Sequence, residues 1–146
     1  MVKKRSVILL VEDNESHALL ARRGLAQFSE ELLVVHVSDG EAALNYLYRR
    51  ENFSSLRVSP RPDLVLLDLR LPKIDGIDVL KEIKQDQDLR SIPVVVLTSS
   101  LAEPDIVNAY YNYANSYLVK ESDFNTFRDE MVEIARYWLN WNVIPL

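Results

Sequence analysis

Residues 64–72 read Leu-Val-Leu-Leu-Asp-Leu-Arg-Leu-Pro, an apolar run that ends in a carboxylate and is followed by a proline. A run this short and this apolar is typical of a strand covered on both faces, as the strands of parallel sheets are. Asp68 would then stand at the carboxyl end of that strand. Open α/β sheets bind their ligands at this edge, so the stretch predicts both a fold class and the place of a site.

Four other apolar runs lie along the chain, and a helical pattern follows each. The runs occupy residues 6–11, 33–37, 93–97 and 116–119. Between them, apolar residues recur every three or four positions. A strand followed by a helix, five times over, indicates a parallel sheet with helices on both faces. The last helix is predicted to be long and to carry one apolar face, which consists of Phe124, Phe127, Met131, Ile134 and Trp138.

Local signals mark two helix starts and one unusual connection. Capping boxes are predicted for Ser38 with Glu41 and for Ser100 with Glu103. Residues 52–62 interrupt the alternation with serines, other polar residues and two prolines. This connection is longer than most in such folds, so we expect a surface excursion or a contact loop there.

The composition limits the classes of protein to consider. The 146 residues, 48% hydrophobic and 27% charged, are predicted to form one domain over residues 1–146, with residues 139–146 as an apolar C-terminal extension. A net charge of -5 disfavours binding to nucleic acid. The absence of cysteine excludes disulfides and thiolate metal sites. We see no signal peptide and no apolar stretch of membrane-spanning length, so we expect no membrane contact and a cytoplasmic location.

Four of the five predicted strands end on a polar residue that could take part in chemistry, namely Asp13, Asp68, Thr98 and Lys120. Right-handed crossovers place all strand C-termini of a parallel sheet on one edge, so these side chains are expected to converge. Each has an ordinary alternative when taken alone. An aspartate can be a turn or cap residue, Thr98 a plain strand-end hydroxyl, and Lys120 a solvated cation. Together, on these strands, they predict one functional site.

The predicted site has the side chains that phosphoryl transfer requires. Glu12, Asp13 and Asp68 would repel one another, and a hard divalent cation such as Mg²⁺ would remove that conflict. We hypothesise that Asp68 is a nucleophile that accepts a phosphoryl group and forms an acyl phosphate. Mg²⁺ on one side and Lys120 on the other would neutralise the charge of that group, and the Thr98 hydroxyl would donate to one of its oxygens.

These residues resemble the receiver domain of two-component response regulators, over nearly the whole chain from Val7 to about Trp138. The resemblance implies an α/β, flavodoxin-like, doubly wound sheet of five parallel strands in the order 2-1-3-4-5. Asp13 and Asp68 would flank the point where the strand order reverses. The motifs that carry the resemblance are Val-Glu-Asp-Asn at 11–14, Leu-Asp-Leu-Arg-Leu-Pro at 67–72 with Asp-Gly at 75–76, Val-Leu-Thr-Ser at 96–99 and Tyr-Leu-Val-Lys at 117–120.

The family also implies a role for each acidic residue. Asp68 would receive the phosphoryl group from a phosphohistidine of a sensor histidine kinase. Asp13, Asp68 and the backbone carbonyl of Arg70 would ligate Mg²⁺, with Glu12 acting through water. The protein would catalyse only its own phosphorylation and slow dephosphorylation, so it is not expected to be an enzyme.

Carried over in the same way, Lys120 and Thr98 would complete the catalytic set with the acceptor. Thr98 and Tyr117 would be switch residues that turn toward the phosphate, as a shift between two populated states. The pattern departs from the family in two places. Glu121 stands where receivers usually have a cis proline, so we expect a trans bond and a rearranged loop. Arg70 is bulky and cationic, and it could pair with an acid or shield the acyl phosphate.

The missing proline, residues 52–62 and the aromatic C-terminus are similar to the bacterial phytochrome-associated single-domain response regulators. That likeness implies a phytochrome-type kinase as partner. Because the chain ends soon after the last helix, we expect no DNA-binding domain, and output through protein contact. The apolar C-terminal segment predicts a homodimer through the last helix, or a kinase-docking surface.

Two other functions fit parts of the pattern. A Mg²⁺-dependent aspartyl phosphatase of the haloacid-dehalogenase-like class uses the same residue types. Its nucleophile, however, belongs to the first strand and needs a second acid two residues on, where this chain has Arg70. An unphosphorylated binding module on a receiver scaffold would not need the complete set of Asp13, Asp68, Thr98 and Lys120.

Overall fold

The structure, a computed structural model, describes residues 5–55 and 59–143. Its centre is a five-stranded sheet in which every pairing is parallel and the strand order is β2-β1-β3-β4-β5. This confirms the α/β, flavodoxin-like sheet and the order 2-1-3-4-5. The strands are β1 (Val7–Val11), β2 (Leu33–Val37), β3 (Leu64–Leu67), β4 (Val94–Thr98) and β5 (Ser116–Val119).

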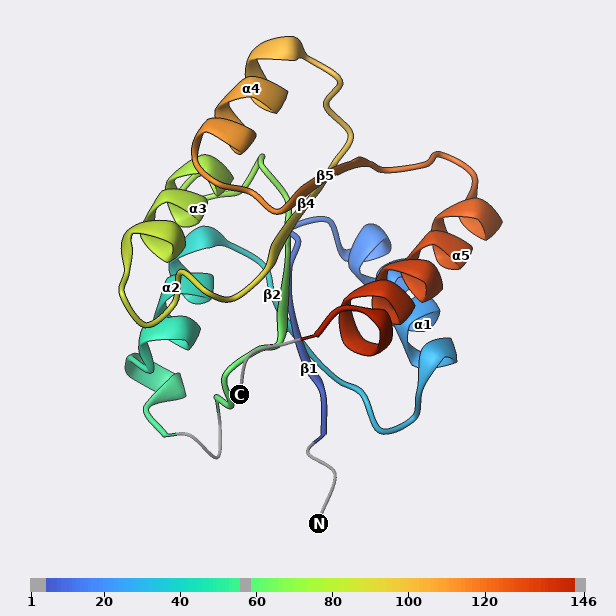
Figure 1. The fold of residues 1–146 in the computed structure, drawn as a ribbon, viewed down its shortest axis with the longest axis horizontal. Coiled ribbons are helices and arrows are strands. Elements are labelled where there is room, and N and C mark those ends of the chain that lie inside the picture. Colours follow the sequence, from blue (N-terminus) through green and yellow to red (C-terminus); the bar gives the residue numbers. More distant parts are fainter. Residues whose placement is uncertain (1–4, 56–58, 144–146) are drawn as a thin grey trace.

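Five α-helices cover the two faces of the sheet (Figure 1). One face carries α1 (Glu15–Phe28) and α5 (Phe124–Ala135). The other face carries α2 (Gly40–Tyr48), α3 (Gly76–Gln85) and α4 (Glu103–Tyr111). Two short elements extend this set, a 3-10 turn η1 (Glu51–Phe53) after α2 and a π-helix η2 (Arg136–Trp141) that continues α5.

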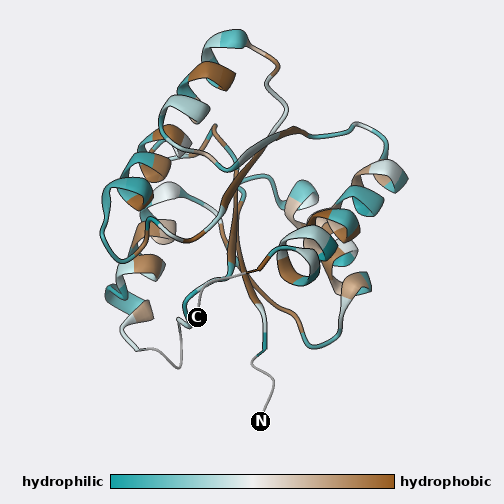
Figure 2. Ribbon diagram, viewed as in Figure 1, coloured by the Kyte–Doolittle hydropathy of each residue, from teal (hydrophilic) through white to brown (hydrophobic). Residues whose placement is uncertain are grey.

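The three central strands are buried on both faces, which is why they are apolar at nearly every position. In β3, Val65 and Leu67 pack in the cluster under α2, α3 and α4, whereas Leu64 and Leu66 pack in the cluster under α1 and α5. All four side chains are 0% exposed. Figure 2 shows the resulting hydrophobic centre between two layers of amphipathic helices. The two-faced burial predicted for the strand before Asp68 is therefore confirmed.

Both predicted capping boxes are wrong in detail. At α2 the N-cap is Asp39, whose carboxylate accepts a hydrogen bond of 2.7 Å from the amide of Ala42. Ser38 lies one residue too early to do this. At α4 the N-cap is Ala102, and no side chain caps the helix. The hydroxyl of Ser100 is engaged elsewhere, as described below.

The last helix is long, as expected, although only its first part is α-helical. Phe127, Met131 and Ile134 are buried against the sheet, as predicted, but Phe124 is 68% exposed. Phe124 is the first residue of the helix. The regular helix ends at Ala135, and the chain continues as η2.

The connection over residues 52–62 is attached to α2 in the parts that the structure describes. Ser59 is buried, and its hydroxyl donates to the carbonyl oxygen of Phe53 at 2.8 Å. The hydroxyl of Tyr46 donates to the carbonyl of Pro60 at 2.6 Å. Residues 56–58 of this connection, and residues 144–146 of the predicted C-terminal extension, lie outside the described residues. Within the described ranges, no helix combines the length and apolarity needed to span a bilayer.

Candidate functional site

Three carboxylates meet at the carboxyl edge of the sheet. Glu12 and Asp13 follow β1 directly, and Asp68 follows β3, which pairs with β1 so that Val11 lies beside Leu67. One oxygen atom from each carboxylate lies within 4.8 Å of the other two. Glu12 and Asp68 are buried, whereas Asp13 is exposed. The arrangement is therefore an acidic cluster that opens toward solvent on one side.

Close backbone packing holds Asp68 in this cluster. Its amide donates to the carbonyl of Val11 at 3.1 Å, and its Oδ1 accepts from the amide of Arg70 at 3.3 Å. The start of α3 packs directly on the same loop, where the Gly76 amide donates to the carbonyl of Leu69 at 2.9 Å. A Cβ at Gly76 would lie 2.2 Å from the Asp68 carbonyl oxygen, so only glycine allows this approach.

Lys120 places its ammonium group inside the cluster. The Nζ atom donates to Asp68 Oδ2 at 3.0 Å and forms an ion pair with Glu12 Oε1. Its side chain is only 6% exposed, and the backbone amide of Lys120 donates to the carbonyl of Thr98 at 2.8 Å. Burial raises the pKa of Glu12, and the hydrogen bond and charge of Lys120 oppose that rise. Lys120 therefore supplies the positive charge that two buried acids require.

Thr98 and Tyr117 are joined through Ser100. Thr98 ends β4 and is buried, and its hydroxyl oxygen accepts a hydrogen bond of 3.4 Å from the amide of Ser100. Tyr117 on β5 is partly buried, and its hydroxyl donates to the carbonyl of Ser100 at 2.8 Å. Burial raises the pKa of Tyr117. The loop after β4 thus connects the two residues predicted to act as switches.

Arg70 pairs with an acid, which was one of the two possibilities considered for it. Its Nη2 atom donates to Asp105 Oδ2 at 2.6 Å, across from the loop after β3 to the first turn of α4. The Ser100 hydroxyl donates to the same carboxylate oxygen. The hydrogen bonds from Ser100 and Arg70 lower the pKa of Asp105. Arg70 in the loop after β3 and Ser100 in the loop after β4 thus bind the same carboxylate at the start of α4.

The donor set fits a hard divalent cation. Carboxylate oxygens are the ligands that Mg²⁺ and Ca²⁺ prefer, and three of them converge here. One ammonium group does not balance three carboxylates, so the cluster keeps a negative charge that a cation would neutralise.

The peptide bond between Lys120 and Glu121 is trans, as expected where no proline follows the lysine.

Two histidines contact this site, although the sequence patterns pointed to neither. His17 Nδ1 lies 3.1 Å from Lys120 Nζ, and His36 Nε2 lies 2.8 Å from the carbonyl oxygen of Glu12. Neither has the spacing of a metal-binding pair, which is the signal usually sought for histidine. The available signal was position, because His17 stands in the first turn of the helix that follows Asp13.

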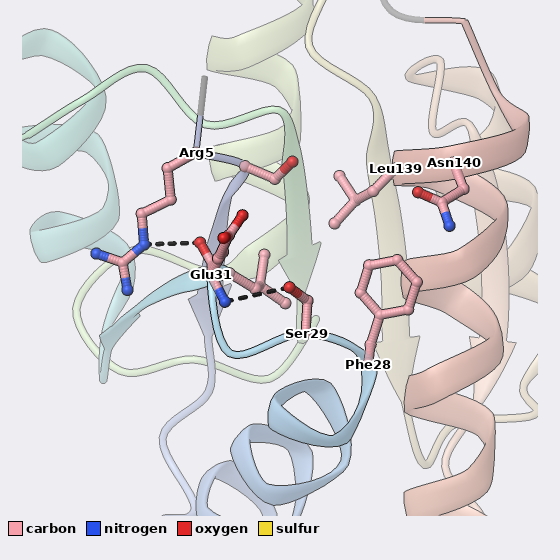
Figure 3. A pocket seen from close by; sticks show the side chains of 8 residues that line it. Arg5, Phe28, Ser29, Glu31, Leu139 and Asn140 are labelled. Carbon is pink, nitrogen blue, oxygen red and sulfur yellow. Dashed lines mark hydrogen bonds between the residues drawn. The ribbon is translucent and has the colours of Figure 1, made fainter. Parts of the chain in front are cut away.

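A separate pocket lies at the opposite edge of the sheet, away from these residues. It encloses about 270 Å³ and lies between the end of α1, the start of β2 and η2 (Figure 3). Arg5 Nε donates to the Glu31 carbonyl at 2.7 Å, and Phe28 and Leu139 form the apolar side. Ser6 precedes β1 and Leu32 precedes β2, so this pocket belongs to the amino ends of the strands.

A doubly wound sheet of this order, with an acidic cluster and a lysine at its carboxyl edge, defines a receiver-type signalling protein. The family described as response regulator receiver domain matches residues 8–132. The chain therefore belongs to this family. Membership implies a divalent-metal site and a histidine kinase partner, and receiver domains are in general signalling modules rather than enzymes.

Several relatives resemble the chain over almost its whole length. It is 47% identical to the probable methanogenesis regulatory protein FilR2 of Methanothrix harundinacea, over 95% of this chain and 87% of the relative. It is 40% identical to the response regulator Rcp1 of Synechocystis, over 95% and 92% of the two chains. The structure matches the phosphorylated cyanobacterial phytochrome response regulator RcpA with a TM-score of 0.93, at 38% identity over 98% of this chain and 100% of the other. It matches the Mn²⁺-bound form of Rcp1 with a TM-score of 0.87, at 39% identity over 97% and 99% of the chains.

Proposed function

We propose that the chain is a single-domain response regulator that accepts a phosphoryl group on Asp68 from a sensor histidine kinase and then changes a protein-interaction surface. The observation that carries this proposal is the 3.0 Å contact between Lys120 Nζ and Asp68 Oδ2 inside an acidic cluster. A buried carboxylate with one cation beside it and one side open to solvent can act as a nucleophile toward a phosphoryl group.

The transfer needs few protein groups. An Asp68 oxygen forms a bond to phosphorus as the bond between phosphorus and the kinase histidine breaks, and the imidazole leaves with the electron pair of that bond. Lys120, already on the acceptor, moves one hydrogen bond to a phosphoryl oxygen. Asp13, Asp68 and the Arg70 carbonyl would hold Mg²⁺ directly, with Glu12 acting through water. When bound, Mg²⁺ supplies the remaining charge neutralisation.

The new phosphoryl group would then bias the loop after β4. The Thr98 hydroxyl now accepts from the Ser100 amide, and donating its proton to the phosphoryl group would draw this loop inward. Tyr117, bonded to the Ser100 carbonyl, would follow it. Output would therefore be a shift between two arrangements of the loop and of α4, with Thr98 and Tyr117 as the switch residues.

Partners follow from the relatives and from the exposed side chains. Phytochrome response regulators are among the structural matches, which supports a phytochrome-type kinase as phosphoryl donor. Tyr137 and Trp141 of η2 are 47% and 65% exposed, which supports a homodimer through the last helix and the aromatic C-terminal segment. A cytoplasmic location, no nucleic-acid partner and no activity on another substrate complete the proposal.

Incubation with acetyl phosphate and Mg²⁺, followed by intact-mass measurement, tests the chemistry. We expect one added phosphoryl group in the wild-type protein and none in Asp68→Ala. Continuous release of free phosphate over many turnovers would instead indicate an aspartyl phosphatase. No adduct in the wild-type protein, with or without a kinase, would indicate a binding module on the receiver scaffold.

A further inference from the structure

The ammonium group of Lys120 has three N–H bonds, and the structure provides three acceptors for them. Two are the carboxylates of Glu12 and Asp68. The third is Nδ1 of His17, 3.1 Å from Nζ. The lysine side chain is 6% exposed, so its ammonium group is largely shielded from water, whereas the His17 side chain is 42% exposed.

The contact fixes the tautomer of His17. An ammonium group can only donate, so Nδ1 must be the acceptor and the ring hydrogen must lie on Nε2. The 3.8 Å separation between Nδ1 and Glu12 Oε1 is consequently not a hydrogen bond. Burial and the charge of Lys120 both lower the pKa of His17, in keeping with a neutral ring.

The backbone of His17 is held independently of its ring. The residue lies in the first turn of α1, and its amide donates to Asn14 Oδ1, the N-cap of that helix, at 3.0 Å. The imidazole therefore reaches Lys120 from the first turn of a capped helix. Such a helix holds the backbone of His17 rigidly, so the ring is well positioned to contact Lys120. Replacing the ring would leave this cap intact.

The three partners of Lys120 differ in one respect. Glu12 and Asp68 belong to the acidic cluster that would hold a cation, and their oxygens would be drawn toward it. Asp68 would also give up its lysine contact as the phosphoryl group arrives. His17 lies outside that cluster, so it is the partner whose contact with Lys120 neither event removes.

We propose that His17 is a positioning residue that keeps the Lys120 ammonium beside Asp68 while the cation and the phosphoryl group occupy the other partners. This inference deepens the proposed function and rests on it, because it assigns to His17 a part in phosphorylation of Asp68. If His17 has this role, the rate of Asp68 phosphorylation depends on a hydrogen-bond acceptor at the position of Nδ1, and not on the imidazole ring itself.

Three substitutions separate the acceptor from the ring. Asn places its Oδ1 where His places Nδ1, Gln places its acceptor one bond further out, and Leu has none. With acetyl phosphate and Mg²⁺, we expect His17→Leu to slow phosphorylation of Asp68 about three- to tenfold, because a hydrogen bond to a charged group is lost at a partly open site. His17→Asn should stay within about twofold of the wild-type rate, and His17→Gln should resemble His17→Leu. Ser16→Ala, an exposed position in the same helical turn, is the matched control.

A spectroscopic measurement tests the contact without phosphorylation. The ¹⁵N chemical shifts of the His17 ring should show that Nδ1 carries no hydrogen and accepts a hydrogen bond from the Lys120 ammonium group. We expect this both with and without Mg²⁺. The lysine signal should move in His17→Leu and stay in place in His17→Asn.

The two proposals can fail separately. If the wild-type protein forms no adduct, the proposed function fails, and the nitrogen signals still show whether His17 holds Lys120. The proposed positioning role of His17 is wrong if the adduct forms on Asp68 at equal rates in the wild-type and His17→Leu proteins. It is also wrong if the Lys120 signal has the same position in the wild-type, His17→Leu and His17→Asn proteins.

Discussion

Lys120 neutralises part of the negative charge of the acidic cluster in the metal-free protein. Removing one partner of a buried ion pair leaves the other charge uncompensated, which costs about 3 kcal/mol. We therefore expect Lys120→Met to lower the free energy of unfolding by about 2 to 3 kcal/mol, measured by urea denaturation without metal. Millimolar Mg²⁺ should recover part of this loss, because it binds only the folded site.

Lys73→Met is the matched control for that experiment. The Lys73 ammonium lies 3.7 Å from Asp39, but its side chain is 58% exposed. Exposed pairs contribute about 0 to 1 kcal/mol, so this variant should unfold close to the wild-type midpoint. Equal midpoints for Lys120→Met and Lys73→Met would mean that the acids near Lys120 do not need its charge.

We expect Lys84 to make the free energy of unfolding depend on pH in the alkaline range. Its Nζ donates to the carbonyls of Arg90 and Ile92 at 3.0 and 2.8 Å and to Asn115 Oδ1 at 3.0 Å. Burial lowers its pKa to about 8, below the value of about 10.4 for an unfolded lysine. Between these values the unfolded chain binds more protons, so the free energy of unfolding rises with pH.

A comparison of variants isolates this effect. From pH 7.5 to 9.5, the stability of the wild-type protein relative to Lys84→Met should rise by about 1 to 2 kcal/mol. The difference between the two proteins cancels the other titrating groups. Lys81→Met, at an exposed position of the same helix, should show no such trend. A flat difference for Lys84→Met in urea titrations at several pH values would contradict the lowered pKa.

Individual residues show how far sequence reasoning extends. Four residues could be placed at one edge of the sheet because each ends a strand, and parallel strands have their carboxyl ends at the same edge. They are Asp13, Asp68, Thr98 and Lys120. The partner of a side chain could not be predicted in this way. Whether Arg70 would pair with an acid or cover the acceptor depended on the position of α4, which no local pattern specifies.

At the scale of elements, the contact between α3 and the acceptor loop is unusually close. A Cβ at Gly76 would lie 2.2 Å from the Asp68 carbonyl oxygen and 2.5 Å from Leu69 Cα. Both are backbone atoms, so the helix itself would have to move. We expect Gly76→Ala to lower the free energy of unfolding by about 2 to 3 kcal/mol, the upper range for overpacking, and to slow phosphorylation of Asp68.

The exposed neighbour Asp78 provides the control for Gly76→Ala. Asp78→Ala changes the same first turn of α3 without entering the loop, so both its urea midpoint and its phosphorylation rate should stay near the wild-type values. A stable, fully reactive Gly76→Ala protein would show that α3 can shift without disturbing the acceptor.

Element boundaries were predicted less well than the elements. The number and order of strands and helices followed from hydrophobic period, which reflects burial and survives small shifts. Helix starts depend on single hydrogen bonds. Ser38 and Asp39 can both cap a helix, and only the path of the chain selected Asp39. The change from α5 to η2 has no sequence signal that we can identify.

For the whole molecule, topology places the site, and the apolar side chains of η2 form the interaction surface that we propose. The ring of Tyr137 contacts two tryptophan rings edge to face. Its centroid lies 5.0 Å from that of Trp138 and 6.4 Å from that of Trp141. Trp138 packs on the core beneath α5, whereas Trp141 and Val143 are 65% and 90% exposed. Such a patch on the surface is characteristic of an interface, and tryptophan is among the side chains that contribute most to binding.

The proposed homodimer can be tested at Trp141. In sedimentation experiments over a concentration series, the wild-type protein should dimerise, and Trp141→Ser should weaken the dimer at least about tenfold, because an anchor residue that the interface would bury is lost. Tyr111→Ser is the control, since Tyr111 is 79% exposed but lies on α4, away from η2. If the Tyr111 variant loses the dimer instead, the interface is on α4. A protein that stays monomeric at high concentration, phosphorylated or not, excludes the dimer and leaves the aromatic cluster as a surface for docking the kinase.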